Sequence, residues 1–156
     1  MGFIKYANDV TAPVSVAFAY AENPRAIPQW MPWATHCERI GTTERGAGAK
    51  YDVRFRVGLW HPVLRWTITE HRQDAVLTYA LSGPVTAGLT LRFDPLGRGR
   101  SVLVTEIDYR LPTGFAATLR DRPRRALLRT TLQRVQDQLR REIEEFHGRD
   151  VVGRYA

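Results

Sequence analysis

Aromatic and charged side chains alternate along several short segments in the middle of this 156-residue chain. In residues 51–57, Tyr51 and Phe55 fall on one phase of the alternation, and the aspartate and both arginines fall on the other. A wall of aromatic rings binds flat apolar molecules and orients them through tyrosine hydroxyls. The candidate ligand-binding residues on this phase are Tyr6, Tyr51, Phe55, Trp66, Tyr79, Phe93 and Tyr109. The alternatives are that these rings fill a solid core, or that the arginine phase faces inward.

Trp30 and Trp33 lie on either side of a Met-Pro pair, in a segment whose prolines interrupt regular structure. Both are candidate ligand-binding residues, because large aromatic side chains there could form a lid over an apolar cavity. Packing of this segment against the rest of the protein is the alternative. His36 follows closely and is the candidate catalytic residue, since imidazole moves protons near neutral pH. A hydrogen-bonded structural histidine is the alternative for His36.

Signatures of other chemistries are missing from the sequence. None of the three serines lies in a nucleophile-elbow motif, and the four histidines lack the helical spacing of a zinc site. Cys37 is the only cysteine, which excludes an internal disulfide and gives thiol chemistry little support. We therefore predict no metal and no cofactor.

The net charge of +7 comes almost entirely from arginine, because only two residues are lysine. A basic chain can bind nucleic acid or an anionic membrane surface. The alternative explanation is the codon bias of a GC-rich genome. No nucleic-acid recognition motif accompanies the charge, so we predict no nucleic-acid partner. The arginines are concentrated only in the last predicted helix, where we hypothesise a peripheral contact with an anionic surface through Arg122, Arg125 and Arg129.

That helix is predicted from about Arg120 to His147. Its apolar residues recur at steps of three and four: Leu128, Leu132, Val135, Leu139, Ile143 and Phe146. Pro123 requires the helix to begin near it or to bend there. Gly148 is a natural C-terminal cap, which leaves residues 149–156 as a tail.

The segments between about Cys37 and Leu111 follow the two-residue period of strands. Short connections between them favour antiparallel neighbours. One helix, about 10 Å across, cannot cover a flat sheet whose strands are about 4.8 Å apart. The sheet must therefore curl around the helix and enclose an apolar space. We expect Leu132, Val135 and Leu139 to form the helical wall of this space and to contact the ligand.

Residues 3–10 predict a first strand, and two short helices follow it. Thr11 and Pro13 supply a capping hydroxyl and a first-turn proline for one helix, and Asn23 and Pro24 repeat the pattern for the next. The chain thus predicts an α+β fold, a curved antiparallel sheet of six to seven strands around a long C-terminal helix. The N-terminus lacks the features of a signal peptide, so we expect a cytoplasmic protein.

This order of elements is the helix-grip arrangement. Residues 10–18 (VTAPVSVAF), together with Asn23-Pro24 and the segment 28–32 (PQWMP), resemble the opening of the START-like (SRPBCC) superfamily of polyketide cyclases/dehydrases and lipid-transport proteins. Residues 94–101 (DPLGRGRS) are similar to that family's last hairpin. The resemblance covers nearly the whole chain and implies a single START-like domain at residues 1–148.

The resemblance implies binding of a hydrophobic small molecule, a lipid or a polyketide-like compound, between the sheet and the C-terminal helix. The alternative hypothesis is a polyketide cyclase/dehydrase that acts on an aromatic polyketide in the same cavity. There His36, or a cavity tyrosine or arginine, would move protons. The sequence agrees with an enzyme or a binding protein, and with a monomer or a homodimer.

Overall fold

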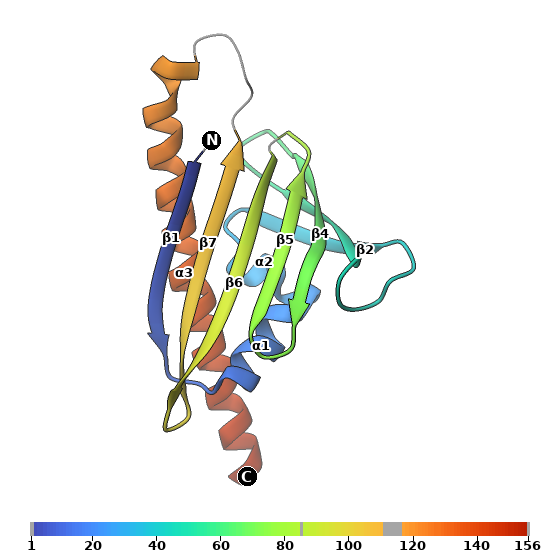
Figure 1. Cartoon of the computed structure of the whole chain (residues 1–156). Coiled ribbons are helices and arrows are strands. Elements are labelled where there is room, and N and C mark those ends of the chain that lie inside the picture. Colours follow the sequence, from blue (N-terminus) through green and yellow to red (C-terminus); the bar gives the residue numbers. More distant parts are fainter. Residues whose placement is uncertain (1, 85, 111–116, 156) are drawn as a thin grey trace.

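The computed structural model describes residues 2–84, 86–110 and 117–155, with side chains described for residues 3–84, 86–109, 126 and 129–149. Within these residues, the strands are β1 (Gly2–Val10), β2 (Ala34–Ile40), β3 (Lys50–Phe55), β4 (Val63–Arg72), β5 (Val76–Ser82), β6 (Thr86–Gly97) and β7 (Arg100–Arg110). The helical segments are α1 (Val14–Glu22), the 3-10 turn η1 (Pro24–Ala26), α2 (Ile27–Trp30) and α3 (Ala117–Tyr155). This is the predicted α+β helix-grip fold (Figure 1).

The strands form one antiparallel sheet in the order β1-β7-β6-β5-β4-β3-β2. The predicted alternation of its two faces is confirmed. Tyr51 and Trp66 are cross-strand partners on the buried inner face, and Tyr79 is buried there too. Arg54 and Arg92 are exposed on the outer face. The arginine phase therefore faces outward, and the inverted alternative is wrong.

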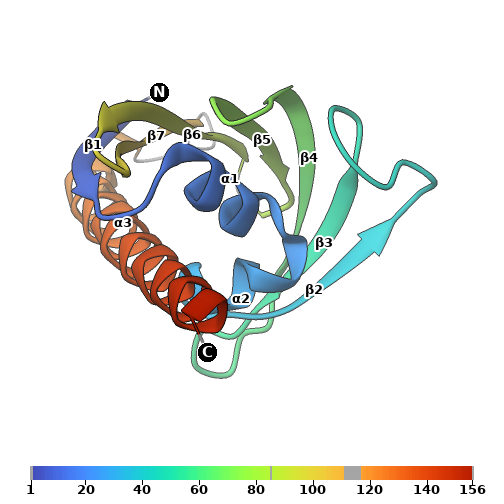
Figure 2. The same cartoon turned by 90° about the horizontal axis from the view of Figure 1, so that it is seen from below.

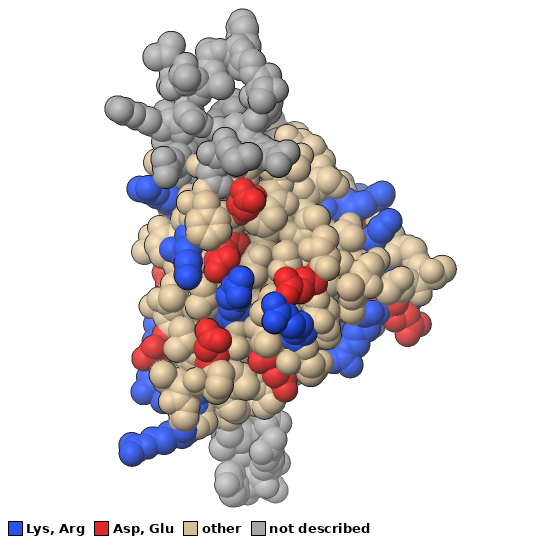
Figure 3. Space-filling model, viewed as in Figure 1, with Lys and Arg blue, Asp and Glu red and all other residues tan. Residues whose placement is uncertain are grey.

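The outer face of the sheet carries charges of both signs, interspersed (Figure 3). Glu106 Oε1 lies 3.3 Å from Arg92 Nε and 3.9 Å from Lys5 Nζ. On the neighbouring part of the sheet, Arg65 Nε donates to Asp52 Oδ1 at 3.2 Å. On the described part of this face, positive and negative side chains therefore lie interspersed and partly paired.

The sheet curves through an open arc, with α1 and α2 inside the arc and α3 along its open side (Figure 2). α3 packs mainly against β1 and β7 at one edge of the sheet and against α1 and α2. In the described residues it has no comparable packing on β4, β5 or β6. α1 covers part of the remaining inner face, where the rings of Phe18 and Phe93 lie 5.7 Å apart between centroids. The wide sheet thus accommodates a single long helix by curving, and the helices do not fill all of the space inside the curve.

Of the two side chains predicted to cap the short helices, one does so and the other does not. Asn23 caps η1 as predicted, because its Oδ1 accepts a hydrogen bond from the Arg25 backbone N–H at 3.1 Å. Thr11 does not cap α1, and that prediction is wrong: its backbone N–H and its hydroxyl both donate to Glu144 of α3. The pairing ties the start of α1 to α3.

α3 continues past Gly148 to Tyr155, so the predicted cap at Gly148 is wrong and residues 149–155 are helical. Glycine inside an exposed helix costs about 1 kcal/mol and does not by itself end the helix. Arg149 Nη2 lies 3.8 Å from Glu145 Oε2 one turn earlier, which supports the helix across the glycine. At the other end, the first turn of α3 is bent away from the helix axis (Figure 1), as expected near Pro123.

A buried polar contact fixes α3 on β7. Gln136 is only 1% exposed. Its Nε2 donates to the Leu103 carbonyl at 2.9 Å, and its Oε1 accepts a hydrogen bond from the Thr105 hydroxyl at 2.7 Å. Because a buried polar group without a partner is costly, these bonds favour one rotation and one height of α3 on the sheet. The predicted apolar stripe of α3 did not include Gln136.

We predict that Gln136→Leu lowers the free energy of unfolding by about 1–3 kcal/mol, because it leaves the buried Thr105 hydroxyl without its partner. The double variant Thr105→Val/Gln136→Leu should recover part of this loss, since both buried polar side chains are then gone. Urea denaturation measures these differences, with Gln133→Leu, exposed on the same helix, as the matched control. Equal stability of the Gln136→Leu and Gln133→Leu variants would contradict the role of Gln136.

Candidate functional site

An apolar cavity of about 240 Å³ lies between α3 and the inner face of the sheet. Its walls come from the connections α2–β2, β3–β4 and β5–β6, from strands β3 to β7 and from the middle of α3. The described lining residues are Met31, Pro32, Trp33, Phe55, Val57, Trp60, Pro62, Leu64, Trp66, Leu81, Pro84, Ala87, Leu89, Ile107, Thr131, Leu132 and Val135. None of these side chains carries an ionisable group.

The cavity extends from a buried floor to an exposed rim. At the floor, Trp66, Leu89 and Leu132 are at most 2% exposed. At the rim, Trp33 is 42% exposed and Trp60 is 57% exposed. In the part of the chain that the structure describes, the cavity therefore opens to the surface beside two indole rings.

The structure brings part of the predicted ligand-binding set to this cavity. The candidates that line it are Trp33, Phe55, Trp66, Leu132 and Val135. The candidates that lie elsewhere, in the core or packed against it, are Tyr6, Trp30, Tyr51, Tyr79, Phe93, Tyr109 and Leu139. The short helices explain part of this division, since α1 covers Phe93 and α2 places Trp30 against Trp66, with ring centroids 6.0 Å apart.

Other lining residues were not among the predicted ligand-binding residues. Leu81 and Leu89 could have been found from the inward phase of their strands, which they share with Tyr79. Val57 could have been found in the same way, because it shares the inward phase of Tyr51 and Phe55. Trp60 could not, because it reaches the cavity through a turn in which it forms an isolated bridge with Val57. The direction of such a turn depends on the sheet around it and not on the local sequence.

Trp33 holds a backbone conformation that is unfavourable for a bulky residue. Its φ is +64°, in the left-handed region. Its carbonyl accepts a hydrogen bond from the Arg56 backbone N–H at 2.8 Å, and the Arg134 guanidinium carbon lies 5.8 Å from the centroid of its ring. These contacts hold the indole at the rim of the cavity. Strain of this kind is concentrated at functional sites, where the surrounding structure maintains it.

Trp66 lines the cavity with its ring, whereas its indole N–H is enclosed by protein. Its indole Nε1 is buried and has no hydrogen-bond partner in the described structure. The ring packs edge-on against Tyr79, with centroids 5.2 Å apart, which fixes its position. A buried N–H without a partner is costly to stability.

The candidate catalytic residue, His36, does not line the cavity. It is exposed on the outer face of β2, opposite Arg54 in the strand pairing, and its Nδ1 lies 3.0 Å from Thr35 Oγ1. The position of His36 therefore gives it no access to a ligand held between the sheet and α3.

Buried acidic groups near the cavity stay protonated at neutral pH. Burial raises the pKa of the Cys37 thiol to about 11. Burial likewise raises the pKa of the Tyr51 and Tyr79 phenols above their ordinary value. In their protonated forms these groups are poor bases and poor nucleophiles, and they can pack or donate hydrogen bonds.

A polar cluster lies apart from the cavity, where the end of α1 meets β4. His71 Nε2 lies 3.0 Å from Glu22 Oε2, and Arg45 Nη2 lies 2.5 Å from Glu22 Oε1. The ring of Phe18 packs edge-on against His71 at 5.3 Å between centroids. Each of the carboxylate oxygens of Glu22 has a partner, so the cluster is satisfied and ties α1 to the sheet.

Two further observations concern metals and membranes. Among the described residues, no group of three or more histidine, cysteine, aspartate or glutamate side chains is placed to hold a metal ion. Nor does any helix in the described ranges combine the length and the apolar character needed to cross a bilayer. Of the three arginines predicted to contact an anionic surface, Arg129 is exposed, whereas the side chains of Arg122 and Arg125 lie outside the described residues.

Solved structures share this fold at low sequence identity. A START superfamily protein from Mycobacterium smegmatis is 14% identical, with a TM-score of 0.71 over 92% of this chain and 97% of that one. The Zhui aromatase/cyclase from Streptomyces sp. R1128 is 15% identical, with a TM-score of 0.68 over 92% and 93%. Norcoclaurine synthase from Thalictrum flavum is 17% identical, with a TM-score of 0.68 over 92% and 87%. At these identities the likeness shows the fold alone.

A search of the curated proteins gives no match. Residues 4–144, in contrast, match a family described as polyketide cyclase / dehydrase and lipid transport. The match includes every strand from β2 to β7, both short helices and the part of α3 that lines the cavity. The chain therefore belongs to the polyketide cyclase/dehydrase and lipid transport family.

Proposed function

We propose that the protein binds a flat, apolar, polyketide-like molecule of about two fused rings in the cavity between α3 and the sheet. The observation that supports this best is an apolar space left open in an otherwise packed core. An unfilled apolar cavity lowers stability by on the order of a few kcal/mol, so its retention favours a function. The fold and the family agree with hydrophobic ligand binding in general.

The size of the cavity narrows the class of ligand. Its volume of about 240 Å³ exceeds that of an apolar cavity of ~150 Å³, which binds benzene. It lies below the ~300–1,000 Å³ typical of sites for drug-sized ligands. The three tryptophans of the lining, Trp33, Trp60 and Trp66, offer planar apolar surfaces that suit a flat ligand. A lipid with two acyl chains would not fit in the described space.

A solved structure of the same fold gives a further indication of the class of ligand. The solved norcoclaurine synthase with the same fold holds dopamine and hydroxybenzaldehyde, which are aromatic molecules with oxygen substituents. We therefore favour an oxygenated aromatic ligand over a pure hydrocarbon.

We do not extend the proposal to the predicted alternative, a cyclase/dehydrase. General acid/base catalysis requires a titratable group within hydrogen-bond reach of the substrate. The described lining residues supply none, and His36 lies on the opposite face of the sheet. Binding is the function that the described residues support.

A substitution that fills the cavity should change ligand affinity and protein stability in opposite directions. We predict that Ala87→Phe, which adds a ring to the lining, weakens the binding of 2-naphthol at least about tenfold because it occupies the ligand's space. The same change should raise the free energy of unfolding by about 0.5–2 kcal/mol, as cavity-filling substitutions commonly do. Isothermal titration calorimetry measures the affinity, and urea denaturation measures the stability.

The matched control for this pair of measurements is Ala80→Phe on the exposed face of the neighbouring strand β5. It should change neither quantity appreciably. Destabilisation of Ala87→Phe by about 1–3 kcal/mol, the usual effect of overpacking, would show that no usable space exists. Unchanged binding by a stable Ala87→Phe variant would place the ligand elsewhere.

Replacing Trp33 tests whether its indole contacts the ligand at the cavity rim or only packs against the protein. We predict that Trp33→Gly weakens 2-naphthol binding about tenfold, since a wall of the rim is lost. The melting temperature should change little, because glycine relieves the positive φ while the partly exposed ring contributes few core contacts. Calorimetry and thermal denaturation measure the two effects. A melting temperature lowered by many degrees with unchanged affinity would assign Trp33 to packing alone.

A further inference from the structure

The turn between β3 and β4 presents apolar side chains to solvent on a rigid support. We define the hairpin tip as residues 57–60, Val57-Gly58-Leu59-Trp60. The backbone N–H groups of Val57 and Trp60 each donate to the other residue's carbonyl, at 2.8 and 3.0 Å. Gly58 has a φ of +62°, which a two-residue hairpin turn with glycine in its first position requires. The tip is therefore an ordered turn.

The second turn position, Leu59, is 99% exposed. Polar residues satisfy such a position at least as well, so the turn itself gives no reason for leucine. Val57 and Trp60 beside it are also exposed, as is Trp33 across the cavity rim. A contiguous exposed apolar patch, in contrast to a single exposed leucine, marks an interaction site.

Within residues 53–69, the segment that carries the tip, every charged residue is positive, and Arg54 shares a surface hollow with Glu38 and Asp52 of the sheet. No aspartate or glutamate occurs between Asp52 and Glu70, whereas this segment contains Arg54, Arg56 and Arg65. Arg65 is paired with Asp52. Arg54 and Arg56 are exposed and have no ion pair among the described residues. The apolar tip projects into solvent, and the unpaired arginines Arg54 and Arg56 flank it. This combination is complementary to an anionic lipid surface.

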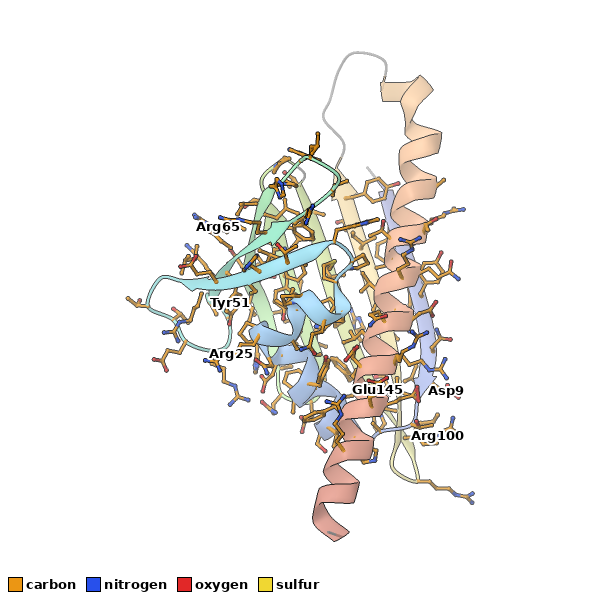
Figure 4. The ribbon with its side chains drawn as sticks, turned by 180° about the vertical axis from the view of Figure 1, so that it is seen from behind. Asp9, Arg25, Tyr51, Arg65, Arg100 and Glu145 are labelled. Carbon is orange, nitrogen blue, oxygen red and sulfur yellow. The ribbon has the colours of Figure 1, made fainter. Side chains whose placement is uncertain are left out.

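The place of the tip in the fold fits the same partner. The β3–β4 turn lies at the end of the molecule where α3 begins, as both side views show (Figures 1 and 4). Val57 and Trp60 belong to the tip and also line the cavity. A surface that covers the tip would thus lie directly against the cavity rim, which suits the passage of an apolar ligand.

We propose that the hairpin tip docks the protein on an anionic lipid bilayer, with Leu59 and Trp60 entering the boundary between headgroups and acyl chains. Arg54 and Arg56 then contact lipid phosphates. A second copy of the chain is a poorer occupant, because a few side chains on a convex turn expose far less than the ~800 Å² per partner that a stable interface buries. This docking goes beyond the proposed ligand binding and does not depend on it.

Co-sedimentation of the full chain with phosphatidylcholine vesicles, with and without phosphatidylserine, tests the docking. We expect the unmodified protein to bind the vesicles that contain phosphatidylserine. Leu59→Asp should lower the affinity for these vesicles about tenfold or more, because aspartate does not gain the free energy that leucine gains on transfer from water into lipid. Leu59 does not line the cavity and is fully exposed, so Leu59→Asp should keep its fold and its affinity for 2-naphthol. The matched control is Leu96→Asp, in the exposed hairpin at the opposite end of the molecule, which should bind vesicles like the unmodified protein (Figure 1).

A second variant isolates the electrostatic part. Arg54→Gln/Arg56→Gln should weaken binding only to the phosphatidylserine vesicles and should reduce its dependence on salt. The proposal is overturned if the unmodified protein ignores anionic vesicles, or if Leu59→Asp binds them as well as Leu96→Asp. It is also overturned if sedimentation shows a dimer that Leu59→Asp dissociates, which would make a second copy the occupant. Each of these results leaves the 2-naphthol test of ligand binding unaffected.

Discussion

The rest of this structure depends on one constraint: a single helix is much narrower than the sheet that it has to cover. α3 is about 10 Å across, and strands about 4.8 Å apart make the sheet several times wider. The sheet responds by curving, and in the described residues α3 packs mainly against β1, β7 and the two short helices. The middle strands then face a space that α1 and α2 fill only in part. The cavity is thus a consequence of the architecture, and the side chains decide how much of it remains.

Polar contacts decide where α3 lies, and hence where the space is left. Gln136 joins the helix to β7, and Glu144 joins it to Thr11 at the start of α1. With these points fixed, Leu132 and Val135 face the middle of the sheet across the cavity. On the sheet side, Ala87 is too small to reach them. The position of the helix and the size of that one residue together leave room for a ligand.

The sequence predicted the two faces of the sheet and the long helix because both depend on local periodicity, which burial on one side imposes directly. It could not predict which inward rings meet a ligand. Phe93 and Trp66 have the same pattern around them, but only Phe93 lies under α1, and the sequence does not tell how far a short helix extends over a sheet. The sequence could not place Trp60 at the cavity for a similar reason, since the surrounding tertiary structure sets the direction of its turn. His36 lies exposed on the outer face of β2, opposite Arg54, and its closeness to Trp33 along the chain did not indicate this face.

The account rests on the claim that the space between α3 and the sheet is apolar and open to occupation. Diffraction from crystals of the protein held under xenon pressure tests this most directly, since xenon enters dry apolar cavities. We predict xenon between Trp66, Leu89 and Val135, with the surrounding side chains unmoved. Side chains packed across this space, or ordered waters in it without xenon, would contradict the account.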